Sequence, residues 1–208
     1  MTIEPSEQIF YDKSQIYQKW LIRIISQQLT EPVLIVWLTD LSDNEIDKMV
    51  LTKSNKIAGA IHHTKLFEYL FENKGVLPDP VNTLTWMDEV SNLDSISVTE
   101  FKINLIENSL SGVGFNKVSI NESINFINLF RDLALQLNDK MLYRLSRKKE
   151  IKELWEFGYD EIFWKEFGSG EAVPAVRIPQ LPINFDRLKI GLNKMIISFI
   201  NKIEIIDK

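Results

Sequence analysis

The two histidines of the chain, His62 and His63, are the side chains best suited to move a proton near neutral pH. Histidine is also a common metal ligand, but two ligands on one helix need a spacing of three or four residues. The residues at those spacings are Lys65, Leu66 and Phe67, so the sequence predicts no local metal site. A histidine acting as a base with a distant carboxylate remains open. It would make the protein an enzyme or a small-ligand carrier with a pocket between helices.

Other patterns that could carry chemistry are incomplete. The glycines at 112–114 match the start of a dinucleotide-binding loop, but Lys117 occupies the place of its third glycine. The acidic run 40–47 has the composition of a calcium loop, yet Glu45 and Leu51 stand where that loop needs a glycine and a bidentate acid. Cysteine is absent, which excludes thiolate catalysis and sulfur-ligated metals. We therefore predict no catalytic, cofactor-binding or metal-binding residues.

A cluster of positive charge lies in the second half of the chain. Within a helix, Lys149 and Lys152 would each have a glutamate four residues later and would form local ion pairs. Arg144, Arg147 and Lys148 have no such neighbour. One hypothesis is that these three contact phosphates in a nucleic-acid-handling complex. The alternative is that the charges simply face solvent where the helix bends.

Six aromatic residues fall within residues 155–167, more than one face of two short helices can bury. Large aromatic residues and arginine are enriched at the centres of protein interfaces. The next segment, residues 168–184, contains three prolines and two glycines and is predicted to be an extended arm. The arm either contributes to partner binding or folds back over the aromatic residues, and both interpretations remain open. The predicted partner-binding residues are Trp155, Tyr159, Phe163, Trp164, Phe167 and Arg177.

The elements that would position these residues are predicted to be mainly helices, so the expected fold class is mostly α, a compact multi-helix domain. Apolar spacing predicts a first helix from Ser6 to a stop at Pro32. Serine followed three residues later by glutamate has the spacing of a capping box, which marks a helix start. This pattern predicts helices that start near Ser42, Ser97 and Ser119.

The remaining segments complete this expectation. Apolar spacing predicts helices over 56–73, 139–157 (with a break near Ser146), 160–167 and 185–206, and the prolines indicate a loop between residues 76 and 86. The run at 33–38, VLIVWL, is short and β-branched, and period alone leaves it as either a strand or a buried helical segment. The apolar face of the last helix would pack inside its own domain or make a homo-oligomer through residues 185–206.

The predicted organisation is a helical domain over 1–167, the arm over 168–184 and a C-terminal helix over 185–208 that packs on the same domain. Hydrophobic residues make up 45% and charged residues 25% of the chain, as in soluble globular proteins. No secretory signal is visible and the longest apolar runs are too short to cross a membrane, so a cytoplasmic location is expected. A net charge of -5 disfavours a surface coated by nucleic acid.

Taken together, these observations favour a non-enzymatic intracellular interaction, assembly or adaptor protein. Its partner surface is expected around residues 155–182, and the partner is a protein of unknown identity. The nucleic-acid hypothesis and the enzyme or carrier hypothesis are the alternatives.

Overall fold

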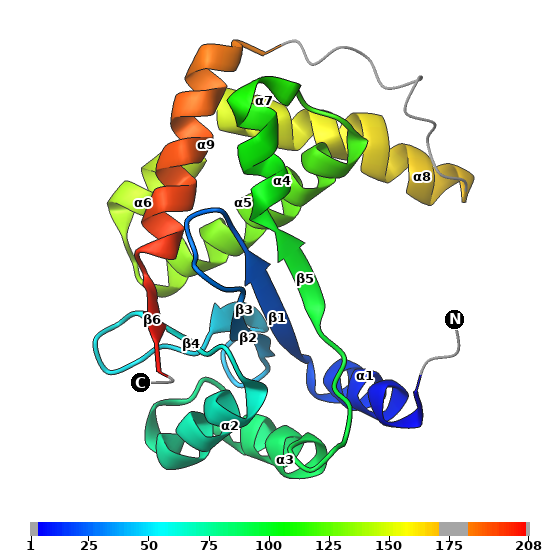
Figure 1. Ribbon diagram of the computed structural model, residues 1–208, viewed down its shortest axis with the longest axis vertical. Coiled ribbons are helices and arrows are strands. Elements are labelled where there is room, and N and C mark those ends of the chain that lie inside the picture. The colour runs from blue at the N-terminus through cyan, green and yellow to red at the C-terminus, as the bar shows by residue number, and fades with distance from the viewer. Residues whose placement is uncertain (1–3, 171–182, 207–208) are drawn as a thin grey trace. The chain divides into compact units, whose positions relative to one another are not determined.

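The structure is a computed structural model and describes residues 4–170 and 183–206, apart from the side chains of Val113 and Ser169. The chain forms two compact units. Unit 1 contains the chain up to Ile25, Leu29–Glu100 and the chain from Asn201; unit 2 contains Ser26–Gln28 and Phe101–Ile200. The elements are coloured along the chain in Figure 1.

The prediction of a mostly α fold is wrong, because the chain has a mixed α/β fold with a substantial sheet. Strand β1 (Lys19–Ile25) pairs antiparallel with β2 (Val33–Asp40), and β2 pairs antiparallel with β3 (Ile46–Met49). With β5 (Thr99–Lys102) they form a four-stranded sheet in the order β3-β2-β1-β5. The β element expected around residues 33–38 is confirmed as a strand, and nearly every residue of β2 is buried.

The rest of unit 1 consists of helices and a second, two-stranded sheet. The second sheet is parallel and contains β4 (Ile57–Gly59) and β6 (Ile203–Ile205). The helical segments of unit 1 are α1 (Pro5–Tyr17), α2 (His63–Glu72), η1 (Lys74–Val76) and α3 (Pro80–Val90). Trp86 lies fully buried among them, edge-on to the rings of Phe10 and Phe67 at 5.9 and 5.7 Å between centroids. Large aromatic side chains thus join α1, α2 and α3 in one core.

The single long helix predicted up to Pro32 is wrong. Its first half is α1, which ends where Gln18 adopts a left-handed conformation with φ of 54°. The second half is β1, whose residues Trp20 to Ile25 are apolar on both faces except for Arg23. A strand that is buried on both faces has a continuous run of apolar residues in its sequence. Such a run also contains apolar residues at the three- and four-residue spacings of a helix, so it does not distinguish the two. The β-branched isoleucines favour the strand.

The helix predicted to start near Ser42 is also wrong. Asn44 and Glu45 both have positive φ, at 54° and 57°, and make the tight turn that joins β2 to β3. The Ser42 hydroxyl donates to Asp40 Oδ1 at 2.6 Å instead of capping a helix. Lys48 donates to Asp40 Oδ2 at 2.9 Å, which closes the hairpin from its second strand. Serine and asparagine serve turns as well as caps, so the spacing alone did not distinguish the two.

Two further predictions in unit 1 are corrected. Residues 56–73 are not one helix, because Ile57–Gly59 is strand β4 and α2 begins only at His63. Pro80 starts helix α3 within the segment predicted to be a loop, and proline is favoured in the first turn of a helix. The left-handed conformation of Asp79, with φ of 45°, turns the chain into that helix.

Unit 2 is helical apart from the end of β5. Its elements are α4 (Ile103–Asn108), the π-helical turn η2 (Ser109–Val113), α5 (Lys117–Gln136), α6 (Lys140–Ser146), α7 (Lys149–Gly158), the π-helical turn η3 (Tyr159–Phe163), α8 (Trp164–Ser169) and α9 (Phe185–Ile200). The helix predicted to begin near Ser97 starts later, because Thr99–Lys102 is strand β5. None of the helices described in either unit is long and apolar enough to cross a membrane.

Helix α5 is the centre of unit 2, as its apolar spacing predicted. Its cap lies three residues before the predicted one: Asn116 Oδ1 accepts from the Ser119 amide at 3.0 Å, and the Ser119 hydroxyl receives the Asn116 amide at 2.9 Å. Helix α7 lies against α5 at Gly158, where an added Cβ would come within 2.1 Å of Ile124 Cδ1. A glycine at this position therefore lets the two helices approach closely.

Helix α9 buries its apolar face inside unit 2. Leu188, Leu192, Met195 and Phe199 are fully buried, and α9 packs against α6 and α7. The prediction that the helix continues to residue 206 is wrong, because the chain leaves it after Ile200 and enters strand β6. The apolar residues of 185–206 that were predicted to join two copies of the chain are thus largely buried within one copy.

Candidate ligand pocket and partner-binding surface

The chain bends between α6 and α7, as predicted for the region of Ser146. Asp139 caps α6 by accepting the amides of Met141 and Leu142 at 2.9 and 3.2 Å. The helix ends at Ser146, which is fully buried and whose hydroxyl donates to the Tyr143 carbonyl at 2.9 Å. A serine hydroxyl that competes for a backbone carbonyl is typical of a helix end.

A cavity of about 380 Å³ opens where this bend meets α5. Its volume is at the lower end of the range for small-molecule sites. Helices α5 and α7 each contribute two side chains, α6 contributes one and the bend after α6 contributes Arg147; the lining residues are Arg131, Leu135, Tyr143, Arg147, Lys152 and Trp155. We refer to this cavity as the arginine pocket.

The two arginines of the pocket each lie over an aromatic ring. The Arg131 guanidinium carbon is 4.9 Å from the centre of the Trp155 ring, and that of Arg147 is 5.3 Å from the Tyr143 ring. Arg147 also donates to the Tyr143 hydroxyl at 2.8 Å, whereas Arg131 makes only a long contact of 3.5 Å to the Ser146 carbonyl. Within the described ranges, neither guanidinium forms an ion pair with a carboxylate. Stacking holds both groups in place without neutralising them.

The electrostatic environment of Arg131 is unfavourable for its own charge. Burial lowers the pKa of Arg131 below its ordinary value, and the positive charge of Arg147 lowers it further. Asp132 and the hydroxyls of Tyr159 and Tyr143 act in the opposite direction but do not restore the pKa. Arginine stays protonated at neutral pH even with a lowered pKa, so Arg131 keeps its charge. The lowered pKa means that this charge is held in an electrostatically unfavourable place.

A chain of hydrogen bonds fixes the aromatic wall of the pocket. The Trp155 indole nitrogen donates to Asn128 Oδ1 at 2.7 Å, and Asn128 Nδ2 donates to the Tyr159 hydroxyl at 3.2 Å. The rings of Trp155 and Tyr159 are 4.4 Å apart. Since Asn128 belongs to the central helix α5, it sets the position of both rings.

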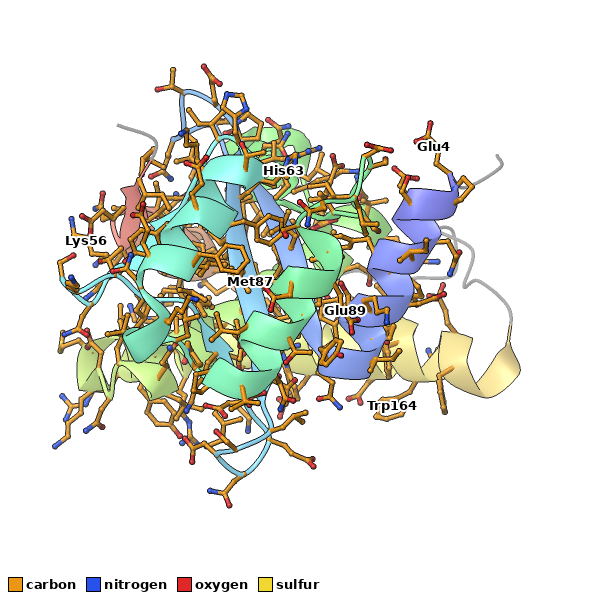
Figure 2. The ribbon with its side chains drawn as sticks, turned by 90° about the horizontal axis from the view of Figure 1, so that it is seen from below. Glu4, Lys56, His63, Met87, Glu89 and Trp164 are labelled. Carbon is orange, nitrogen blue, oxygen red and sulfur yellow. The ribbon has the colours of Figure 1, made fainter. Side chains whose placement is uncertain are left out.

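The aromatic residues that follow the pocket are exposed. The exposed fractions of Phe163, Trp164 and Phe167 are 45%, 55% and 76%. Their rings contact one another, with centroids 4.9 Å apart for Phe163 and Trp164 and 5.9 Å apart for Trp164 and Phe167. In Figure 2 the labelled Trp164 side chain projects away from the ribbon of α8. We call these three residues the aromatic patch.

The aromatic patch begins at the turn η3, where the helical repeat changes. Ile162 in this turn is buried and anchors it, while Phe163 beside it is exposed. Tyr159 links the patch to the pocket, because its ring lies 5.2 Å from that of Phe163 and 4.4 Å from that of Trp155. A π-helical turn shifts the side chains that follow it relative to an α-helix, and such turns are frequent at functional sites.

The structure thus brings most of the predicted partner-binding residues together. Trp155 and Tyr159 are half-buried beside the pocket and the other three aromatic residues are exposed. Arg177 and most of the predicted arm lie outside the described residues. The three predicted phosphate contacts, Arg144, Arg147 and Lys148, are all exposed, and of these Arg147 lines the pocket whereas Arg144 and Lys148 do not. Lys149 and Lys152 pair with the predicted glutamates four residues later, at 3.6 and 3.2 Å.

The sequence analysis missed Arg131, Asn128 and Tyr143. Arg131 lies in a helix that was predicted from its apolar residues, and its neighbours in the pocket are distant in the chain. One signal was available: Arg131 is the sole lysine or arginine between residues 118 and 139. A lone cation in a largely apolar helix needs a partner or a functional reason.

The histidines belong to unit 1, whereas the residues of the arginine pocket belong to unit 2. His62 is the last residue before α2 and His63 is its first. The His63 ring is edge-on to Phe67 at 6.2 Å, and burial lowers its pKa, with a smaller contribution from His62. Over the described part of the chain, no cluster of three potential metal-ligating side chains occurs. Figure 2 labels His63 on its helix.

The most deeply buried charges also lie in unit 1. The Lys19 ammonium donates to Asp79 Oδ2 at 2.7 Å and to the carbonyls of Tyr17 and Thr39 at 2.8 and 3.0 Å. Asp79 additionally accepts from Asn82 Nδ2 at 3.0 Å. Because all three donors of Lys19 are used inside the unit, this arrangement ties the start of β1 to the start of α3 and is structural.

Comparison with known proteins gives a likeness of fold. No family model and no curated protein matches the chain. One solved structure, described as the SatS C-terminal domain in complex with bromine, aligns with a TM-score of 0.60 and 13% sequence identity. The alignment covers 93% of this chain and 97% of that domain, so both units contribute to it. The chain therefore has the same fold as the SatS C-terminal domain.

Proposed function

We propose that the protein is a non-enzymatic interaction or adaptor protein that binds a protein partner through its aromatic patch. The observation that carries this proposal is the exposure of Phe163, Trp164 and Phe167, which contact one another at the surface. Single exposed apolar residues are ordinary, but a contiguous group of large aromatic side chains marks an interaction site. Aromatic residues also supply most of the hot spots in protein interfaces.

The charges around the patch favour a protein over a nucleic acid. Residues 149–169 contain three lysines and six acidic residues, which gives a net charge of -3 for this segment. A phosphate backbone lying along it would be repelled. Lys165 pairs with Glu161 and Lys117 pairs with Glu166 beside the exposed rings. An aromatic centre with a rim of paired charges is the usual composition of a protein–protein interface.

The partner we expect presents an apolar groove or pocket that receives these rings. Burying large side chains gives about 25 cal/mol per Å² of apolar area removed from water. The rings already contact one another, so less conformational entropy is lost on binding than for isolated side chains. The patch would then be the energetic centre of the interface.

The test compares two double variants. Tagged wild-type protein is incubated with nuclease-treated native lysate, and the captured partner is identified, purified and titrated calorimetrically. We expect Trp164→Ala with Phe167→Ala to weaken binding at least about tenfold, as for interface hot spots. Met141→Ala with Ile190→Ala is the matched control, because these apolar residues of unit 2 are also exposed, by 71% and 53%. Equal affinity of both variants, or the absence of any nuclease-resistant partner, would contradict the proposal.

A further inference from the structure

We propose that the arginine pocket is a binding site for a small organic anion, in which an oxyanion bridges Arg131 and Arg147 and an attached aromatic ring lies against the apolar wall. This site is separate from the aromatic patch, and the inference does not depend on the proposed protein partner. The shared chemistry of the ligand is a carboxylate or phosphate group on a flat ring.

The unused hydrogen-bond donors of the two arginines support an oxyanion. A guanidinium has five N–H donors in one plane. In the described structure Arg131 uses one in a long contact of 3.5 Å, and Arg147 uses one at 2.8 Å. The remaining donors have no protein acceptor there. Arginine binds carboxylate and phosphate groups through paired donors, so two such groups lining one cavity match a bridging oxyanion.

The balance of charge in the pocket supports the same conclusion. Arg131 and Arg147 repel each other, and burial adds to the cost at Arg131. Lys152 at the edge of the pocket already has Glu156 as its partner, at 3.2 Å. Among the described residues, no carboxylate lines the pocket to neutralise the two arginines. A bound anion would offset the repulsion between the two guanidinium groups, and this makes the free energy of anion binding more favourable.

The apolar wall and the size of the pocket define the rest of the ligand. Leu135 and Trp155 line the cavity from α5 and α7, and its volume is about 380 Å³. This space exceeds the volume of a single inorganic anion and accommodates a ring. Trp155 is held by Asn128 and cannot turn freely, so the wall is preorganised.

Three probes test the proposal. Phenyl phosphate presents a phosphate group on a phenyl ring, and benzoate presents a carboxylate on the same kind of ring. Inorganic phosphate has no ring. Binding to the full chain is followed by titration calorimetry and by the nuclear magnetic resonance signal of the Trp155 indole N–H, assigned with Trp155→Phe. We expect at least one ring-bearing anion to bind saturably, to shift this signal and to bind at least about tenfold tighter than inorganic phosphate. The ring-bearing anion that binds more tightly shows whether the site prefers a phosphate or a carboxylate.

Matched variants assign the site. Arg131→Gln and Arg147→Gln should each weaken the ring-bearing anion by about tenfold or more, because each removes charged hydrogen bonds. Arg144→Gln is the control, since this exposed arginine lies on the same helix as Tyr143 but does not line the cavity. It should leave the affinity within twofold. Thermal unfolding confirms that each variant is folded.

Three results would overturn the inference. The first is no saturable binding of either ring-bearing anion to the wild-type chain. The second is binding that Arg131→Gln and Arg147→Gln leave unchanged, or that Arg144→Gln weakens equally. The third is equal affinity for inorganic phosphate, which would remove the ring from the proposed ligand. Partner capture by the aromatic patch is measured separately, so failure of one proposal is distinguishable from failure of the other.

Discussion

Replacing Asp79 with asparagine tests how strongly unit 1 depends on its buried ion pair. Lys19 is fully buried and Asp79 is 3% exposed, so neither charge is solvated by water. Asparagine has nearly the same shape as aspartate and tolerates the left-handed conformation of residue 79, whereas alanine would add backbone strain. The substitution therefore removes the charge and little else.

The expected effect follows from the hydrogen bonds of the Lys19 ammonium. Two of its three bonds, to the carbonyls of Tyr17 and Thr39, survive in Asp79→Asn. The third becomes a neutral contact, and losing a charged hydrogen bond costs about 1.5–3 kcal/mol. Removing the acceptor altogether with Asp79→Ala leaves a buried charge uncompensated and should cost about 3–5 kcal/mol. The larger loss approaches the whole stability of a small protein, so asparagine is the informative variant.

The free energy of unfolding is measured by urea denaturation, followed by tryptophan fluorescence and far-ultraviolet circular dichroism. Lys65→Met is the control, because Lys65 forms an exposed ion pair with Glu68 in the same unit and such pairs contribute below about 1 kcal/mol. The double variant Lys19→Met with Asp79→Asn should lose less than the sum of the single losses. A loss for Asp79→Asn as small as for the control, or full additivity, would refute the role assigned to this pair.

Three further predictions concern other parts of the chain. Gly158→Ala should destabilise the protein by about 1–3 kcal/mol in urea denaturation, because the new methyl group collides with Ile124, and a shorter valine at 124 should restore part of the loss. Burial alone would raise the pKa of Asp40, but hydrogen bonds, including that from Lys48, hold it below its ordinary value of 3.8. The stability from Asp40 is therefore present at neutral pH and lost as pH falls through the lowered pKa, and Asp40→Asn should reduce the slope of stability against pH below about 4; an unchanged slope would contradict this. Finally, fluorescence anisotropy with single-stranded DNA in low salt should detect no binding that depends on the basic residues 144–148, and tight binding abolished by charge reversal there would favour the nucleic-acid hypothesis.

The helices of unit 2 were the most predictable part of the chain. Helices α5 and α9 bury apolar residues at spacings of three and four on one face, which is the pattern that sequence reasoning detects best. The break after Ser146 was also predictable from the irregular apolar pattern around it. Some ends were misplaced, as for α9, which gives way to a strand, and the helix predicted separately over 160–167 instead continues from α7 through η3 into α8.

The sheet was not predictable in the same way. Strands β1 and β2 are apolar on both faces, so they lack the alternation that distinguishes a strand from a buried helix. The serine–glutamate pairs at Ser42 and Ser97 satisfied the spacing of a capping box but precede strands. Ser42 bonds to Asp40 in a hairpin turn and Glu100 lies within β5, and the partner strands that decide the outcome are remote in sequence.

The two candidate sites also differ in how far the sequence predicted them. The aromatic patch is local in sequence, and its residues were identified from their density between residues 155 and 167. The arginine pocket depends on Arg131 of α5 meeting Arg147 from the bend after α6 and Trp155 from α7. A contact between helices depends on their packing, and no pattern within one helix encodes it.

The parallel pairing of β4 with β6 has a consequence for synthesis of the chain. Ile57 and Gly59 emerge from the ribosome early, but their partners Ile203 and Ile205 are made after every residue of unit 2. At roughly 5–20 residues per second, the edge of β4 that pairs with β6 waits roughly 7–30 seconds for its partner. Unit 2 is complete sooner than unit 1, although unit 1 begins first. Nascent unit 1 is therefore the part of the chain most exposed to aggregation and to chaperones during translation.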